Sequence, residues 1–127
     1  MSGRLVVVAT PIGNLADLSA RARSVLEAAD VICCEDTRRT RALLTAMGIP
    51  SGRRLVSVHA HNEASKATWV ADRVCAGATV AYVTDAGTPL VSDPGARLVA
   101  GVLERGGEVT TVPGPSAALA ALVVSGL

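Results

Sequence analysis

The sequence predicts an α/β fold, a single domain built on a five-stranded, mostly parallel sheet with helices on both faces. Apolar, β-branched runs alternate along the chain with segments whose apolar residues recur at helical spacing. The β-branched runs are apolar at nearly every position, which is typical of parallel strands that are buried on both faces. The chain has 127 residues, of which 50% are hydrophobic, and this size supports one core and one domain.

The strands are expected at the short apolar runs. The first run, RLVVVAT, spans residues 4–10 and is β-branched at its centre. The other expected strands are residues 30–36, 54–60, 79–85 and 108–113. Each pair of consecutive strands is separated by enough residues for a helix, so that every connection can cross over to a parallel neighbour.

The helices are expected between and after the strands, and their ends carry capping signals. They are expected within residues 18–30, 37–48, 62–77, 95–107 and 116–126. Gly48 and Gly77 are suited to close two of these helices, and Asn62 is suited to open one. The sequence SDPG predicts a further helix start, with Ser92 or Asp93 as the N-cap and the following proline in the first turn.

Composition argues against several classes of function. Aromatic residues make up 2% of the chain and Phe is absent, which argues against an aromatic platform that stacks RNA bases. No apolar stretch reaches membrane-spanning length without a charge or a proline, so we expect a soluble, cytoplasmic protein with no membrane contact. The motifs GxGxxG, GxxxxGK(S/T) and GxSxG are absent, which removes the main support for dinucleotide-binding, P-loop and hydrolase functions.

The cysteines and histidines do not form a metal-binding pattern. Cys33, Cys34 and Cys75 are odd in number and lack CxxC spacing, so neither a disulfide framework nor a zinc site is predicted. We expect all three to be reduced thiols in the core. His59 and His61 have no cysteine or carboxylate at ligand spacing, and no metal is expected.

The charges are unevenly distributed, although the net charge is only +1. Residues 37–62 contain five arginines and no carboxylate, a balance of +5, whereas residues 1–36 contain three arginines and five acids, a balance of −2. A solvated basic face without a partner is one interpretation. The preference for Arg over Lys favours phosphate recognition, because the guanidinium fork matches phosphate oxygens.

Four loops that follow predicted strands are rich in glycine, proline and polar residues. They read ATPIGNLAD, EDTRRT, DAGTPLVSDPG and PGPSA. In open parallel sheets, ligands bind outside the carboxyl ends of the strands. Glycine lets the backbone approach a ligand closely and proline fixes the turn around it, so we expect the functional site at this edge.

These loops together resemble one family. The segments VATPIGNLAD, CEDTRRTRALLTAMGI, HAHNE, VTDAGTPLVSDPG and VPGPSAALAALVVSGL are similar to the tetrapyrrole-methylase superfamily, and within it to the branch of 2′-O-ribose methyltransferases of small-subunit ribosomal RNA. The resemblance runs from Leu5 to Leu127. It implies use of S-adenosylmethionine by a two-domain, homodimeric enzyme with the cofactor between the domains. Residues 1–127 would then be the amino-terminal α/β domain, without the carboxyl-terminal domain.

The resemblance also implies which residues line the cofactor site. They are Pro11, Asp85, Ala86, Gly87, Thr88, Val91, Ser116 and Ala117. Other members of the superfamily have a GxGPGD pattern in the first loop, whereas this chain has TPIGNLAD, which is characteristic of the rRNA branch and argues against a tetrapyrrole substrate. Ser116 is also a natural N-cap for the helix that follows it.

The implied reaction is methyl transfer from a sulfonium to the ribose 2′-hydroxyl of a cytidine in 16S rRNA. Alignment of the reacting atoms supplies much of the rate, and a base that takes the hydroxyl proton helps further. The ionisable candidates in the right loops are Glu35, Asp36, His61 and Glu63. Two of these have a structural alternative, because Asp36 is a natural N-cap and Glu63 lies at a predicted helix start.

Nearby arginines are candidates for RNA binding, and two other functions remain open. Arg38, Arg39 and Arg41 are expected to contact rRNA phosphates. The first alternative is a small-molecule, tetrapyrrole-type methyltransferase. The second is a non-catalytic domain that dimerises or binds cofactor.

Overall fold

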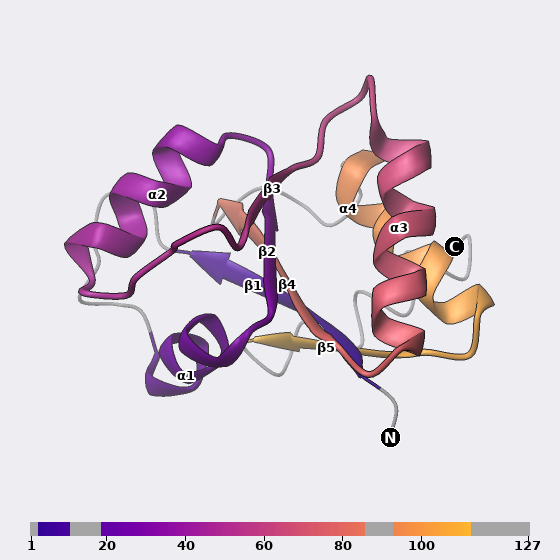
Figure 1. Cartoon of the computed structure of the whole chain (residues 1–127), viewed down its shortest axis with the longest axis horizontal. Helices are drawn as coiled ribbons and strands as arrows, with labels where there is room; N and C mark the ends of the chain where they lie inside the picture. The colour runs from indigo at the N-terminus through magenta and orange to yellow at the C-terminus, as the bar shows by residue number, and fades with distance from the viewer. Residues whose placement is uncertain (1–2, 11–18, 86–92, 113–127) are drawn as a thin grey trace.

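The computed structural model describes residues 3–10, 19–85 and 93–112, and this part of the chain alternates five strands with four helices (Figure 1). The strands are β1 (Arg4–Thr10), β2 (Val31–Cys34), β3 (Leu55–Ser57), β4 (Thr79–Asp85) and β5 (Glu108–Val112). The helices are α1 (Ala20–Ala28), α2 (Thr37–Ala46), α3 (Glu63–Cys75) and α4 (Asp93–Glu104). The predicted fold class is confirmed.

The strands form one sheet in the order β3-β2-β4-β1-β5, and every neighbouring pair is parallel. The longest ladder joins β1 to β4 and runs from the pair Arg4 and Thr79 to the pair Thr10 and Asp85. The carboxyl ends of these two central strands therefore lie side by side.

Helices cover both faces of the sheet, as predicted. Alternate residues of β1 point to opposite faces: Leu5 and Val7 belong to the core under α3 and α4, whereas Val6 and Val8 belong to the core under α1 and α2. Right-handed crossovers require this division, because the chain moves toward β3 through α1 and α2 and returns toward β5 through α3 and α4.

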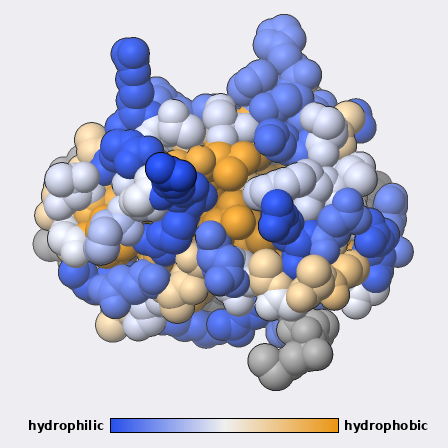
Figure 2. Space-filling view, in the orientation of Figure 1, coloured by the Kyte–Doolittle hydropathy of each residue, from blue (hydrophilic) through white to orange (hydrophobic). Residues whose placement is uncertain are grey.

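One edge of the sheet is only partly covered. All three residues of the edge strand β3 are half-buried. Figure 2 shows a hydrophobic area near the middle of the face that carries this edge, bordered by hydrophilic side chains.

The predicted boundaries agree closely with the structure at most elements. The first and fourth strands match residue for residue, and Gly48 and Gly77 follow α2 and α3 with φ angles of 73° and 104°. The third strand is shorter than predicted, three residues rather than seven, because the chain after Ser57 turns away into a hydrogen-bonded loop. The predicted helix at residues 116–126 lies outside the described residues.

Candidate functional site

The sheet order makes the carboxyl ends of β1 and β4 the point at which the chain connections diverge. The chain leaves β1 for α1 on one face of the sheet, and it leaves the adjacent β4 for α4 on the other face. In open α/β sheets, connections that diverge in this way leave room for a ligand between them. This position is where the sequence places its glycine- and proline-rich loops.

The predicted cofactor residues follow directly from these two strands, but nearly all of them lie outside the described residues. Pro11 comes after Thr10 and Ala86 comes after Asp85, and Thr10 and Asp85 form the last pair of the ladder. The residues outside the described part are Pro11, Ala86, Gly87, Thr88, Val91, Ser116 and Ala117. Asp85 ends β4, although its side chain is also outside the description. Their role in cofactor binding stays a prediction.

Asp36 caps the helix that follows β2. Its Oδ1 accepts hydrogen bonds from the backbone N–H groups of Arg38 at 3.0 Å and Arg39 at 3.2 Å, which satisfies two of the free donors at the start of α2. The neighbouring Glu35 side chain is exposed, and its backbone carbonyl accepts a hydrogen bond from Ser57 Oγ at 3.3 Å. Asp36 therefore has a structural role, whereas the Glu35 carboxylate faces solvent.

The loop between β3 and α3 is held by Asn62. Its Oδ1 accepts a hydrogen bond from the His59 backbone N–H at 2.8 Å, and its Nδ2 donates to the Ser57 carbonyl at 3.0 Å. Asn62 stands just before the helix as predicted, but its side chain makes no capping hydrogen bond, because it is occupied by the loop.

Two exposed imidazoles lie on this loop. The His61 backbone N–H donates to His59 Nδ1 at 3.2 Å, and the two rings meet edge to face with their centroids 5.8 Å apart. A neutral His59 whose Nδ1 accepts a hydrogen bond carries its proton on Nε2. His61 is exposed and makes no side-chain hydrogen bond with the described residues, so its ring is accessible.

Glu63 is the least exposed of the four ionisable candidates. It is the first residue of α3, and its Oε1 lies 3.4 Å from Arg97 Nε of α4. The Glu63 side chain is 15% exposed and that of Arg97 is 59% exposed. Glu63 Oε2 is buried and has no hydrogen-bond partner among the residues that the structure describes. This ion pair joins the start of α3 to α4. Arg97 lies about one turn into α4, which follows the segment that carries the predicted cofactor residues of the fourth loop.

The arginines predicted to bind RNA lie on α2. Arg38 and Arg39 occupy its first turn at the carboxyl end of β2, and both are exposed. Arg41 is also exposed, and its Nη1 donates to Ser51 Oγ at 2.8 Å. The structure therefore places three exposed cations on the helix that begins beside Glu35 and Asp36.

Comparison with known proteins decides the family. A family model described as Tetrapyrrole (Corrin/Porphyrin) Methylases matches residues 4–127. The chain belongs to the tetrapyrrole methylase family. Crystal structures of uroporphyrin-III-C-methyltransferase from Thermus thermophilus share the fold; one superposes on 90% of this chain and 48% of its own, with a TM-score of 0.64 and 26% sequence identity.

Curated relatives of this tetrapyrrole methylase chain carry the name ribosomal RNA small subunit methyltransferase I. The protein from Xylella fastidiosa is 54% identical over 98% of this chain and 45% of its own length. The protein from Neisseria meningitidis serogroup B is 53% identical over 100% of this chain and 43% of its own length. The chain therefore spans less than half the length of these relatives.

The sequence analysis of this tetrapyrrole methylase chain did not single out Tyr82, a buried side chain next to the predicted site. It lies on β4, is 3% exposed, and packs against the backbone at Gly95 near the start of α4. Burial raises the pKa of its phenol, and the nearby Glu35 carboxylate raises it further. The available signal was compositional, because this is the one tyrosine in a chain that has no phenylalanine.

The cysteines agree with the prediction at two positions out of three. Cys33 and Cys34 are free and buried, and burial raises the pKa of the Cys33 thiol to about 12. The prediction for Cys75 was wrong: this thiol is exposed, because it lies on the outer side of the last turn of α3.

Within residues 3–10, 19–85 and 93–112, no group of three or more His, Cys, Asp or Glu side chains could hold a metal ion. No helix in these ranges is long and apolar enough to cross a bilayer.

Proposed function

We propose that this chain is the amino-terminal domain of an S-adenosylmethionine-dependent methyltransferase that modifies the ribose 2′-hydroxyl of a cytidine in small-subunit (16S) ribosomal RNA. The observation that carries the proposal is the sequence identity of 51–54% with proteins named ribosomal RNA small subunit methyltransferase I, over 98–100% of the chain. Because the chain covers 43–45% of those relatives, a carboxyl-terminal domain would complete the enzyme. A homodimer is part of the same proposal.

In this proposal, S-adenosylmethionine binds at the carboxyl ends of β1 and β4. The paired ends of these strands bring the starts of two loops rich in glycine and proline to one place. Backbone N–H and C=O groups of such loops suit the adenine edge, the ribose diol and the amino-acid tail of the cofactor. Pro11, Asp85, Gly87 and Thr88 would contact it from the first and fourth loops, and Ser116 from the fifth. When bound, the cofactor supplies an electrophilic methyl group.

The contacts of the ionisable candidates divide them into two pairs. Asp36 is engaged in capping α2, and Glu63 is engaged with Arg97, which favours structural roles for both. Glu35 and His61 are exposed at the carboxyl edge of β2 and β3, where a ribose hydroxyl could reach them. We therefore favour Glu35 or His61 as the group that accepts the hydroxyl proton.

A second candidate function is methylation of a small tetrapyrrole. The structural similarity to uroporphyrin-III-C-methyltransferase favours it, at 26% identity. The identity with the ribosomal RNA methyltransferases is twice as high, and the first loop departs from the GxGPGD pattern. A non-catalytic dimerisation or cofactor-binding role is the third candidate, and it applies to the 127 residues in isolation.

The deciding experiment is methyl transfer from labelled S-adenosylmethionine to small ribosomal subunits that lack the modification. The enzyme should be this chain joined to the carboxyl-terminal part of a relative. The expected product is a 2′-O-methylated cytidine in the digested 16S rRNA. If ribosomal RNA stays unlabelled while a tetrapyrrole acceptor becomes labelled, the second candidate function replaces the first.

A further inference from the structure

Three arginines lie in or contact the turn between α2 and β3: Arg53 and Arg54 belong to it, and Arg41 reaches it from α2. The turn, residues 50–54, is closed by a hydrogen bond from the Arg54 backbone N–H to the Ser51 carbonyl at 3.1 Å. Gly52 has a φ of +55°, and an added Cβ there would have no heavy atom within 4 Å. The backbone at the tip of the turn is therefore open to a ligand.

Arg54 supports the turn from inside the molecule. Its Nη1 donates to the carbonyls of Leu26 at 2.8 Å and Ala29 at 2.9 Å, at the end of α1. Its Nη2 donates to the carbonyl of Pro50, and its Nε donates to that of Ser51. Arg54 is thereby fixed between α1 and the turn.

Arg41 reaches the same turn from α2. Its Nη1 donates to Ser51 Oγ at 2.8 Å and to the Gly52 carbonyl at 3.3 Å. The guanidinium has five N–H donors in all, and the side chain is exposed, so other donors stay available.

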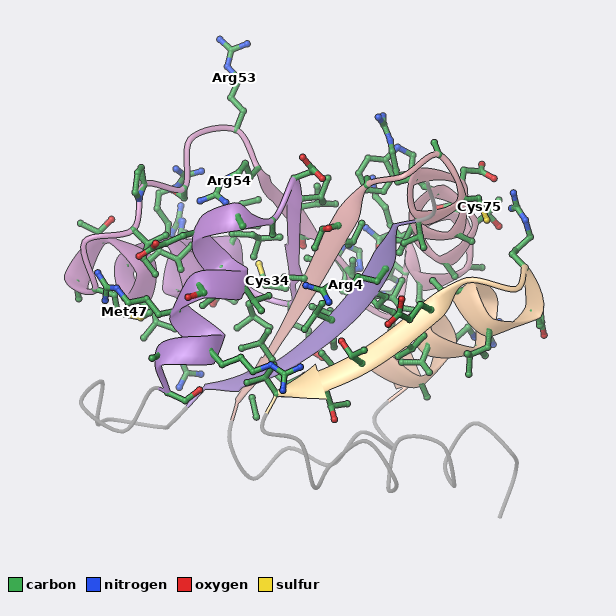
Figure 3. The ribbon with its side chains drawn as sticks, turned by 90° about the horizontal axis from the view of Figure 1, so that it is seen from below. Arg4, Cys34, Met47, Arg53, Arg54 and Cys75 are labelled. Carbon is green, nitrogen blue, oxygen red and sulfur yellow. The ribbon has the colours of Figure 1, made fainter. Side chains whose placement is uncertain are left out.

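Arg53 forms the exposed tip of the turn. Its side chain projects away from the molecule (Figure 3) and forms no hydrogen bond or ion pair with the described residues. The hydrogen bonds of Arg41 and Arg54 go to carbonyl and hydroxyl oxygens, and no carboxylate of the described residues forms an ion pair with Arg41, Arg53 or Arg54. The adjoining hollow is also lined by Glu27, whose carboxylate pairs with Arg23 at 3.0 Å.

We propose that the turn at residues 50–54 is a phosphate-binding site for the RNA backbone, with Arg53 as the principal contact, Arg41 as the second and Arg54 as the support. Like charges gathered without a counter-ion favour the binding of an anion, and guanidinium groups match phosphate oxygens in geometry. The inference rests on the proposed function for its choice of RNA. It extends the basic surface from α2 to the turn before β3.

The test compares two arginine variants of the chain in binding to a labelled single-stranded RNA at several salt concentrations. Arg53→Gln removes the proposed contact and no contact within the described residues. Arg21→Gln, at an exposed residue of α1 that pairs with no other described residue, makes the same charge change elsewhere. We expect Arg53→Gln to weaken binding about five-fold at 0.1 M salt and to reduce the salt slope by about 0.7, one phosphate contact. Equal losses in the two variants, or none in Arg53→Gln, would overturn the proposal.

Two further arms separate the ligand source and the function. Inorganic phosphate should displace RNA no better than KCl at the same ionic strength; stronger displacement would identify a small-anion site and overturn the RNA assignment.

In the methyl-transfer assay, Arg53→Gln should raise KM for the small subunit and leave kcat unchanged. If the extended enzyme methylates rRNA and Arg53→Gln changes neither RNA affinity nor KM, the turn assignment fails while the proposed function stands. If Arg53→Gln weakens RNA binding but the parent enzyme methylates no rRNA, the function fails and the RNA contact stands.

Discussion

Asp36 shows how one contact separates two roles that its residue type allows. Its carboxylate accepts two backbone hydrogen bonds at the start of α2. We expect Asp36→Ala to lower the free energy of unfolding by about 1 kcal/mol and Asp36→Asn to change it little, because Asn caps about as well as Asp. Urea denaturation of both variants measures this. If Asp36→Asn also keeps methyl transfer in the extended enzyme, Asp36 is a cap; loss of turnover in this stable variant would indicate a catalytic carboxylate.

Cys33 makes stability depend on pH in the alkaline range. Burial raises the pKa of this thiol from 9.0 to about 12, so between these values the unfolded chain ionises and the folded chain does not. The free energy of unfolding should therefore fall as the pH rises above 9. At pH 10 the ionisation of Cys33 in the unfolded chain should lower the free energy of unfolding by about 1 kcal/mol.

Two variants isolate this contribution in denaturation curves recorded from pH 8 to pH 10. Cys33→Ala should show a shallower decline than the parent chain. Cys75→Ala, which removes an exposed thiol, is the control and should keep the parent decline. Parallel curves for the parent and Cys33→Ala would contradict the prediction.

At the scale of elements, the start of α4 is positioned by its contact with β4. A Cβ added at Gly95 would lie 2.9 Å from Cε2 of the buried Tyr82 ring. We expect Gly95→Ala to lower the free energy of unfolding by about 1–2 kcal/mol, since overpacking outweighs the helix preference of alanine. The measurement is a double-mutant cycle with Tyr82→Leu, in which the cost of Gly95→Ala should fall. Additive effects would mean that the ring does not set the position of α4.

Helix α2 carries its cations at the end where they stabilise the helix least. Arg38 lies in the first turn, near the positive end of the helix dipole, so its charge is unfavourable to the helix itself. Neutralising Arg38 and Arg41 together should weaken RNA binding and lower the salt slope by about 1.4, two contacts on single-stranded RNA. A salt titration of the binding constant measures this, and an unchanged slope would exclude both residues as phosphate contacts.

At the scale of the molecule, we predict that the 127 residues fold but do not catalyse methyl transfer to rRNA. This chain covers 43–45% of the length of its curated relatives, and under the proposed function the remaining chain would complete the site. The binding sites for cofactor and RNA would each lack the contacts on one side. Alignment of the reacting atoms, which supplies much of the rate, would then be lost. Cooperative urea unfolding together with no labelled rRNA is the expected result, with the extended enzyme as the positive control. Turnover by the chain alone would refute it.

The fold class and most element boundaries could be predicted from the sequence, whereas the predicted location of the site stays a prediction. These features depend on local patterns: β-branched runs, helical spacing, and glycine or proline after a strand. The strand TVAYVTD and the closing residues Gly48 and Gly77 needed no tertiary information. The family resemblance followed from the same loops.

Pairing between distant segments was settled only by the tertiary structure. The order β3-β2-β4-β1-β5 brings Thr10 beside Asp85, and with them the starts of the two loops predicted to bind the cofactor. Arg38 and Arg54 have the same formal charge, yet one is exposed and the other is fixed to carbonyls of α1, 25–28 residues earlier in the chain. Hydrogen bonds and burial depend on which neighbours the fold supplies, and a local pattern of residues carries no record of neighbours that lie far away along the chain.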